Sequence, residues 1–514
     1  MWEMFPKPLT RVIIYTPKES ARKIILTLAN ECYVQLNSSF NDKVISEKAK
    51  PLQPSNLLAR AMNILQRMEN ILKEKVTSDE KFDESQLKLG EEDISYFEKI
   101  TEDFSKGLGD REEFLKAYVR LKAFCNLESV LEKVAQTDKT AVIDIWVKTV
   151  ELEKVIDVVK KVEENSAFEI IEEKSVHGES DKPTLLEKTR MPQVFRKLVL
   201  SFGTPKSNEL EPSIFMAITY PIIFALMFGD FGHGLLLTVF GIALIILQKK
   251  NLKLGETLSL IVSGAKLYII LGITSSIVGL FMYREAFGSH ELAQKIYEAL
   301  HIPEIPENLV LGIIYIPLRL NPIETPLRLA RLSLLIAFFQ VSFGIILSMV
   351  NGLYTKRFWK VLGDIGWVSL YLSIAYLFLI HGRNVISAAL NFNTILYYFL
   401  PPMIIMMIGR IVEEKVNGLL EMLEQIISLI SNTFSYFRIL AIGAAHALFT
   451  KMIFDAGSAL NIFIFIPILV LGTIIIMGFE GLLAFLHCLR LHWVEWFMKF
   501  YSGTGTAFQP LKLV

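Results

Sequence analysis

The stretch SNTFSYFRILAIGAAHALFTKMIF, residues 431–454, is apolar or small almost throughout, yet Arg438 stands near its middle and His446 two turns later. An arginine inside a bilayer costs roughly 2.5–3.5 kcal/mol on insertion scales, and arginine cannot release its proton to escape that cost. Ionisable residues inside membrane helices are functional candidates by default. The stretch therefore predicts a membrane-spanning helix that carries part of a functional site.

The whole chain is apolar, and its charge is unevenly spread. Hydrophobic residues make up 52% of the 514 residues, and the mean hydropathy is +0.41, which is high for a soluble protein. The 53 basic and 53 acidic residues are dense up to about residue 205 and sparse after Pro212. We expect a soluble domain over residues 1–205 and a transmembrane domain over residues 206–514. No apolar leader follows Met1, so we expect the first domain to stay in the cytosol.

Two strand–helix–strand patterns occur in the soluble domain. β-branched and apolar residues predict strands over 11–15 and 32–36, with a helix over 20–30 between them. The pattern recurs over 141–174, where AVIDIWV and AFEIIEE predict strands and ELEKVIDVVKKVEE predicts an amphipathic helix. Two such halves are typical of a compact α/β unit, and a ferredoxin-like arrangement is one candidate.

The segment between these halves is helical. Apolar residues recur at three-to-four spacing over 56–76 and 114–134, which predicts two helices within about 55–135. They either pair as an antiparallel coiled-coil hairpin or form a small helical subdomain. No GxxxxGK[ST] motif is present, so we expect a docking domain without a nucleotide site. The three cysteines have no metal-ligand spacing, and we expect no metal, cofactor or nucleic acid.

Long apolar runs predict the membrane helices. We expect eight spans, at residues 213–229, 232–249, 258–282, 329–352, 364–381, 393–412, 421–455 and 462–497. The last two are about 35 residues long and exceed a hydrocarbon core of about 30 Å. We therefore expect them to tilt strongly or to project from the membrane.

The short loops predict the orientation. Lys and Arg gather in the loops at 248–253, 354–360 and 409–415, whereas the loop at 455–461 has neither. With a cytosolic N-terminus and eight spans, the basic loops all lie inside, and the C-terminus returns to the cytosol. The loop at 283–328 then lies outside, and its segment HELAQKIYEALH predicts an amphipathic surface helix.

Most intramembrane ionisable residues lie in the last two spans. They are Glu424, Arg438 and His446 in span seven, and Glu480, His487, Arg490, His492 and Glu495 in span eight. At about 100° per residue, those of span seven share one broad polar stripe, and Glu480 and His487 share a face of span eight. Taken singly, Glu424 could be interfacial and His446 a structural histidine. Arg490 and Glu495 could reach the cytosolic surface by snorkelling.

Arg438 lies too deep to snorkel. Its neighbours, such as Ser435 and Gly443, are small, and small residues admit another helix or water. We therefore expect Arg438 to face a carboxylate, either Glu480 of this chain or a residue of another subunit.

Three blocks of the sequence resemble a known protein family. They are FALMFGDFGHGLLLT at 224–238, SYFRILAIGAAHALF at 435–449 and EGLLAFLHCLRLHWVEWFMKFYSGTG at 480–505. They resemble the first membrane hairpin and the last two membrane helices of the stator subunit of V-type and archaeal A-type rotary ATPases, called subunit a or subunit I. Asp230 stands in the acidic position of that hairpin. The resemblance runs from about residue 182 to the C-terminus. The part before it resembles the family only in its general organisation, an α/β unit interrupted by helices.

The resemblance implies a mechanism. A ring of proteolipid subunits, each with one buried carboxylate, would rotate past this subunit, and two offset aqueous half-channels would carry protons or Na⁺ to and from the ring. Arg438 would face the ring, because a fixed cation lowers the pKa of a nearby carboxylate and blocks leakage between the half-channels. Glu424 would line the cytosolic half-channel, His446 and Glu480 the outer one, and Arg490 would support Arg438.

The implied partners are the proteolipid ring, peripheral stalk proteins on the cytosolic domain, and membrane lipid, and the Ile- and Lys-rich text favours a prokaryotic, archaeal plasma membrane. The alternative is a secondary transporter with its own proton relay, which predicts internal repeats and broken helices. The sequence shows no such repeat, and its intramembrane charges gather at one end. A purely structural scaffold leaves the mid-depth arginine unexplained.

Overall fold

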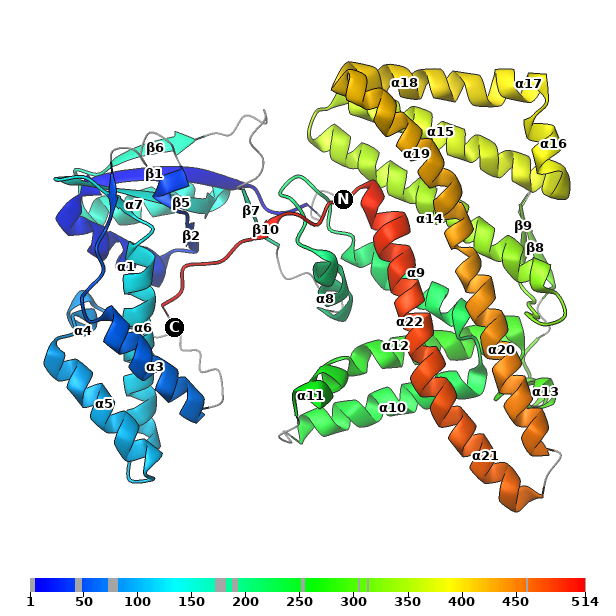
Figure 1. The fold of residues 1–514 in the computed structure, drawn as a ribbon, viewed down its shortest axis with the longest axis horizontal. Coiled ribbons are helices and arrows are strands. Elements are labelled where there is room, and N and C mark those ends of the chain that lie inside the picture. Colours follow the sequence, from blue (N-terminus) through cyan, green and yellow to red (C-terminus); the bar gives the residue numbers. More distant parts are fainter. Residues whose placement is uncertain are drawn as a thin grey trace. The chain divides into compact units, whose positions relative to one another are not determined.

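The chain folds into two compact units. The computed structural model describes residues 5–41, 49–72, 82–171, 182–186, 193–250, 255–303, 306–311, 314–458 and 461–513. The α/β unit comprises Pro6–Glu187 and Gly505–Val514, and the helical unit comprises Met1–Phe5 and Lys188–Thr504 (Figure 1). Parts of the predicted loops at 248–253 and 455–461, and the end of the helix predicted over 56–76, lie outside the described residues.

The α/β unit contains the two predicted strand–helix–strand halves. The first is β1 (Leu9–Pro17), α1 (Ala21–Glu31) and β2 (Val34–Leu36), and the second is β5 (Thr140–Lys148), α7 (Leu152–Val162) and β6 (Ala167–Ile171). The strands pair antiparallel in the order β6–β1–β5–β2, with Ile14 opposite Ile143 in the central pair. This is the strand order of a ferredoxin-like fold. Two short strands, β3 (Lys50–Pro51) and β4 (Ala135–Gln136), extend the sheet beside β5.

The helical insertion has three long helices rather than a two-helix hairpin. They are α3 (Leu58–Leu72), α5 (Glu91–Ser105) and α6 (Arg111–Leu131), with the short α4 (Glu84–Leu87) between α3 and α5. Each long helix packs against the other two. The apolar stripe of α5 buries Ile94 and Phe97, so α5 covers part of the α3 and α6 surfaces that a hairpin would leave open.

The end of the chain belongs to the α/β unit. β10 (Thr506–Ala507) pairs in parallel with β7 (Pro183–Thr184). Farther on, the Leu511 N–H donates to the Val34 carbonyl at 2.7 Å. The side chains of Leu511 and Leu513 lie in the core beneath the sheet. The folded α/β unit therefore holds residues from both sides of the helical unit in sequence.

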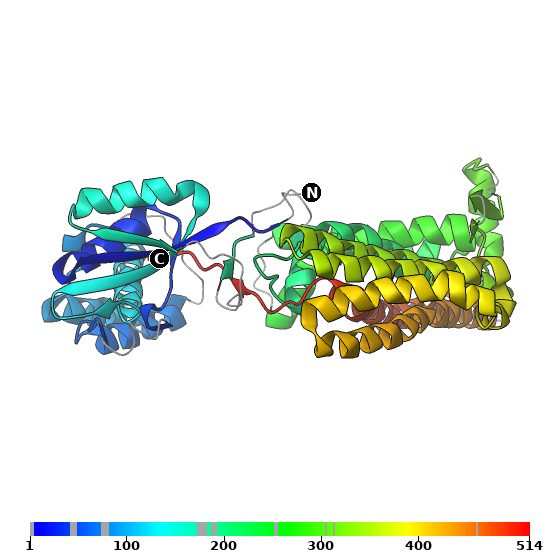
Figure 2. The same ribbon diagram turned by 90° about the horizontal axis from the view of Figure 1, so that it is seen from above.

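The helical unit is a bundle of long apolar helices that lie side by side (Figure 2). Its first part comprises α8 (Gln193–Phe202), α9 (Ser213–Met227), α10 (Phe231–Lys249), α11 (Glu256–Ser263), α12 (Ala265–Val278), the π-helical η5 (Gly279–Tyr283), α13 (His290–Ala299) and the hairpin β8 (Asn308–Leu311) and β9 (Ile314–Pro317). Its second part comprises α14 (Pro326–Tyr354), α15 (Phe358–His381), α16 (Val385–Ala389), α17 (Phe392–Thr394) and α18 (Leu400–Glu414). The amphipathic surface helix predicted in the loop at 283–328 is present as α13.

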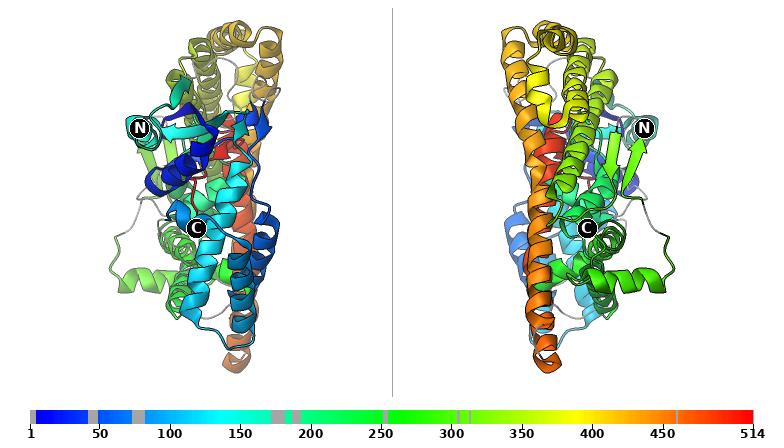
Figure 3. Two further views of the ribbon diagram at one scale, coloured as in Figure 1. Left: turned by 90° about the vertical axis from the view of Figure 1, so that its left-hand side faces the viewer. Right: turned by 90° about the vertical axis from the view of Figure 1, so that its right-hand side faces the viewer.

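Two long helical segments end the unit, as predicted. The first joins α19 (Val416–Ser435) to α20 (Phe437–Ser458), and Figure 3 shows them following one another as a single rod. The second joins α21 (Ile462–Ile475), η8 (Ile476–Glu480), α22 (Gly481–Arg490), η9 (Leu491–Trp496) and η10 (Phe497–Lys499). The candidate spans within them, Asn417–Gly457 and Ile462–Lys499, contain 41 and 38 residues. η8 and η9 are π-helical, and this winding changes which side chains share a face.

Among the described residues, seven helices are long and apolar enough to cross a membrane. Eight spans were expected. The difference lies at the first of them, because the apolar helix α9 is only 15 residues long. Large apolar side chains such as Val239 and Phe463 are exposed on the outer faces of the helices, as expected for a protein whose surface contacts lipid.

One predicted loop residue is a buried helix residue. Arg410, expected in the basic loop at 409–415, lies in α18 and is 3% exposed. Its Nη2 donates to Asp364 of α15 at 2.6 Å, and its Nη1 lies 3.2 Å from Glu421 of α19. Asp364 also accepts a hydrogen bond from Ser348 of α14. This network ties four helices together, so Arg410 has a structural place inside the bundle rather than in a loop.

Candidate functional site

Arg438 lies near the middle of the 41-residue segment, directly after the junction of α19 and α20. Its Nη1 donates a hydrogen bond to Oε1 of Glu495 at 2.9 Å. The Arg438 side chain is 22% exposed, whereas that of Glu495 is 2% exposed. Arg438 thus has an acidic partner within the chain and still presents part of its guanidinium to the surroundings.

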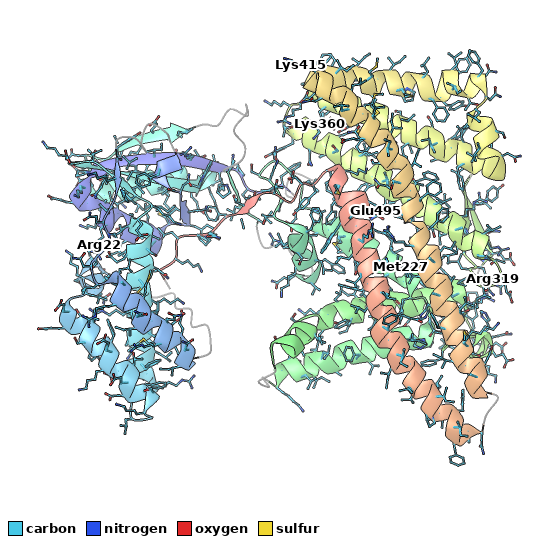
Figure 4. All side chains as sticks on the ribbon, viewed as in Figure 1. Arg22, Met227, Arg319, Lys360, Lys415 and Glu495 are labelled. Carbon is cyan, nitrogen blue, oxygen red and sulfur yellow. The ribbon has the colours of Figure 1, made fainter. Side chains whose placement is uncertain are left out.

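Glu495, which could have reached the cytosolic surface by snorkelling, is buried, and it rather than Glu480 is the in-chain partner of Arg438. Figure 4 labels Glu495 on the last long helix, beside the α19–α20 rod. Glu495 belongs to the π-helical η9, and Glu480 is the last residue of the π-helical η8. A rotation of 100° per residue does not apply through π-helical turns. A helical wheel drawn from Glu480 therefore does not extend through η9 to Glu495.

Glu480 forms a second pair, with His446. The Nδ1 atom of His446 lies 2.8 Å from Oε2 of Glu480. The His446 side chain is 3% exposed and that of Glu480 is 12% exposed. His446 lies two helical turns beyond Arg438 on α20, so the two predicted outer-channel residues meet at a level different from that of Arg438. A histidine hydrogen-bonded to a carboxylate is an arrangement suited to proton transfer.

A second buried histidine lies beside this pair. The rings of His233 and His446 are 5.6 Å apart, and Phe228 packs 4.5 Å from His446. His233 is 2% exposed, and its Nδ1 lies 3.1 Å from Oδ1 of Asp230. His233 did not enter the predicted site, although it stands in the block FGDFGHG that carried the resemblance.

Asp230 fastens a loop to the start of α10. Its carboxylate accepts hydrogen bonds from the backbone N–H groups of His233, Phe287 and Gly288, at 2.9–3.0 Å. Gly288 has φ +76°, and a Cβ there would lie 2.5 Å from the backbone of Thr450. The conformation and the close approach both favour glycine. Asp230 therefore holds this loop against α20 near His446.

Glu285, at the start of this loop, is a buried acid that the sequence did not single out. It is 3% exposed, and His290 lies 3.4 Å from its Oε1. Burial and the neighbouring Asp230 carboxylate raise the pKa of Glu285 to about 8, against the opposing effect of Lys451. Glu285 lies two residues beyond the end of a candidate span, where an acidic residue looks like an ordinary loop residue.

The structure keeps the other two predicted site residues apart from these pairs. Glu424 of α19 and Arg490 of α22 both lie on exposed faces. Between the levels of Glu424 and Arg438, Nζ of Lys499 donates to Ser428 Oγ at 3.0 Å and lies 4.9 Å from the centre of the Trp367 ring. Within the described residues, no group of three or more His, Cys, Asp or Glu side chains is arranged to hold a metal ion.

The fold and the site define a polytopic helical membrane protein with buried ionisable pairs inside its two longest helices. The V-type ATPase 116kDa subunit family matches residues 41–300 and 406–513, which is more than half of the chain. The chain belongs to that family.

Relatives in this family come from archaea and from animals. The chain is 28% identical over 454 residues to the A-type ATP synthase subunit I of Aeropyrum pernix, a match that covers 80% of this chain and 63% of the relative. It is 26% identical over 459 residues to the subunit of the same name from Methanocaldococcus jannaschii, covering 84% and 63%. It is 24% identical over 475 residues to the V-type proton ATPase 116 kDa subunit a 2 of Bos taurus, covering 64% and 55%. The chain thus spans 55–63% of the length of these relatives.

Proposed function

We propose that this chain is the non-rotating membrane subunit of a V/A-type rotary ATPase, and that it couples the movement of protons or Na⁺ to ATP synthesis or hydrolysis. The observation that carries the proposal is Arg438, a permanent cation midway along a long apolar helix, with part of its side chain still exposed. A partly exposed guanidinium at this depth is costly, and a passing carboxylate on a neighbouring subunit would offset that cost.

In this proposal, Arg438 meets the carboxylates of a proteolipid ring one after another. Its positive charge favours the ionised form of each carboxylate, so the ring releases its ion on arrival. The fixed charge also repels protons and Na⁺, which hinders direct passage between the two half-channels. Arginine suits this role better than lysine, because a buried lysine loses its proton more readily.

The proposed half-channels use the remaining polar residues of the two long segments. The His446–Glu480 pair would pass ions on the outer side, because it lies two turns from Arg438 toward the loop that carries α13. Glu424 would serve the cytosolic side, where α19 begins next to the end of α18. Arg490, exposed on α22, would support Arg438 at the ring-facing surface.

The path of the chain supports a cytosolic α/β unit. Residues on both sides of the helical unit in sequence fold together in the α/β unit, and one folded unit lies on one side of a membrane. We therefore infer an even number of crossings. The seven candidate spans and the shorter α9 together give eight. The α/β unit would then bind peripheral stalk proteins through its helices α3, α5 and α6.

Co-purification separates this function from that of a secondary transporter. We expect the tagged chain, extracted from its native membrane in mild detergent, to isolate with a small proteolipid. A photo-reactive residue in place of Ala441, an exposed residue of α20 one turn beyond Arg438, should cross-link to that proteolipid. The matched control places the same residue at Lys295 on the surface helix α13. If the chain isolates alone and moves a substrate by itself in liposomes, the stator function is wrong.

A further inference from the structure

The Arg438–Glu495 ion pair differs from an ordinary buried salt bridge. Glu495 is 2% exposed, and its Oε1 binds Nη1 of Arg438 at 2.9 Å. Its other oxygen, Oε2, is buried and accepts no hydrogen bond from the described residues. A buried carboxylate that lacks part of its hydrogen bonding is costly, so the pair is not optimised for stability alone.

Arg438 has more hydrogen-bond donors than Glu495 uses. A guanidinium carries five N–H donors in a planar fork, and Glu495 takes one of them. The two side chains also differ in access, because Arg438 is 22% exposed while Glu495 is enclosed. A second carboxylate that approaches from the exposed side can therefore bind Arg438 without entering the protein.

Glu495 has a second cation within the chain. Lys499 lies four residues later in the same segment, and the two side chains interact electrostatically. Lys499 is held in place by its hydrogen bond to Ser428 and by its position over the Trp367 ring. Glu495 thus interacts with two cations: the Lys499 ammonium, which is held in place by its neighbours, and the Arg438 guanidinium, which has an exposed side.

We propose that Glu495 is the resident counter-ion of Arg438, and that each arriving ring carboxylate displaces it. This inference rests on the proposed function. Between arrivals, Glu495 neutralises Arg438 and holds the guanidinium in place. When a ring carboxyl group arrives, its proton leaves through a half-channel, its carboxylate binds Arg438, and Glu495 remains beside Lys499. No covalent bond other than that O–H bond changes, and the reverse exchange frees the ring carboxylate to move on.

This exchange weakens the binding of each ring carboxylate to Arg438. The ring carboxylate must compete with Glu495, so it binds less tightly and leaves sooner than it would from an unpaired arginine. Glu495 is therefore a positioning residue that tunes how far Arg438 lowers the pKa of the ring carboxylate. Other titratable side chains that interact with the pair are Tyr436 and His487, and Arg490 acts on His487.

The pH dependence of coupled transport in the assembled complex tests this role. In Glu495→Gln, Arg438 should hold the ring carboxylate in its ionised form to a lower pH. We expect the profile of ATP-driven ion uptake to move toward acid by about one pH unit, and Glu495→Asp to restore most of the wild-type profile. Glu291→Gln on the exposed face of α13 is the matched control and should leave the profile unchanged. A Glu495→Gln profile that overlaps the wild-type profile overturns the proposal.

Two further variants separate the possible failures. If Arg438→Gln retains coupled uptake, the proposed function itself fails, whatever Glu495 does. If Glu495→Gln does not assemble, thermal unfolding of the purified full chain decides. Arg438→Gln should unfold at a lower temperature than Arg438→Gln/Glu495→Gln, because only the single variant leaves Glu495 without its partner. Equal unfolding temperatures overturn the resident pairing.

Discussion

At the residue scale, the buried acidic side chains differ in the groups that hydrogen-bond or pair with their carboxylates. Asp230 is held by three backbone N–H groups, Glu480 by His446, and Asp364 by Arg410 and Ser348. Glu285 has a histidine nitrogen 3.4 Å away and the neighbouring Asp230 carboxylate instead. It is therefore the acid whose protonation should most affect the stability of the fold.

The Glu285→Gln variant should remove part of the pH dependence of stability. The folded chain keeps the Glu285 proton up to about pH 8, whereas the unfolded chain releases it above about pH 4.5. The unfolded state therefore binds fewer protons within this window, and the unfolding free energy falls as pH rises. One group contributes at most about 1.4 kcal/mol per pH unit. Glutamine cannot ionise, so the variant should lose this contribution.

Thermal unfolding of the full chain in detergent between pH 5 and pH 8 measures this effect. The exposed Glu291→Gln variant controls for the loss of one acid. Parallel pH dependences for Glu285→Gln and the wild-type chain would contradict the raised pKa.

Individual site residues were predictable to different degrees. Arg438 and His446 stood out because a membrane helix rarely tolerates an ionisable side chain deep in an apolar run unless that side chain has a function. The acidic residues around them were harder to predict from the sequence. Glu495 was not paired with Arg438 because its place near the end of the last span suggested that it could snorkel to the cytosolic surface, and Glu285 was missed because it lies in a loop. The burial of Arg410 was not expected because Arg410 and Lys415 were assigned to a basic loop, although Glu413 and Glu414 leave that segment without net charge.

At the scale of elements, small residues set how closely the membrane helices approach. Gly409 of α18 lies against α15, where an added Cβ would be 2.3 Å from the backbone nitrogen of Gly363. Gly234 of α10 and Gly272 of α12 lie against each other's helix in the same way. Such contacts are typical of membrane helices, where close packing replaces the hydrophobic driving force.

A Gly409→Ala substitution should therefore push α18 away from α15. Overpacking of this kind costs roughly 1–3 kcal/mol, and it should strain the Arg410–Asp364 network one residue away. Gly478→Ala is the matched control, because no atom lies within 4 Å of an added Cβ there. We expect thermal unfolding in detergent to show a loss for Gly409→Ala alone. Equal unfolding temperatures for the two variants would argue against the close contact.

Helices and strands with a clear pattern of apolar residues were predictable from the sequence. Elements whose place depends on contacts with other segments were not. The β-branched and apolar runs of β1 and β5 and the apolar stripe of α7 identified both halves of the sheet. The helical insertion had an apolar period as well, but α5 was not recognised as a third helix. The short strand β10 carries no period of its own, and its place follows from pairing with β7.

At the scale of the molecule, the return of the chain to the α/β unit constrains the topology. Leu511 and Leu513 lie in the core of that unit, so Gly505–Val514 and Pro6–Glu187 fold together, and the proposed topology therefore has both on one side of the membrane. Nothing in the composition of residues 505–514 indicates this return. It depends on contacts with residues more than 300 positions earlier.

Single cysteines in an otherwise cysteine-free chain test this topology. Cysteines in place of Glu153 on α7 and Thr506 on β10, both exposed, should react with a membrane-impermeant maleimide from the cytosolic side. A cysteine in place of Lys295 on α13 should react from the opposite side. Opposite accessibility of positions 153 and 506 would contradict an even number of crossings.

The most direct test of the central claim is ATP-driven ion uptake by membrane vesicles that contain the assembled complex with Arg438→Gln, measured beside ATP hydrolysis and subunit content. We predict that the complex still assembles and that ion uptake is abolished, because no fixed cation remains to discharge the ring carboxylates. Arg438→Lys should also fall well below the wild-type rate, since a buried lysine loses its proton more readily. Ion uptake at the wild-type rate in Arg438→Gln would contradict the account.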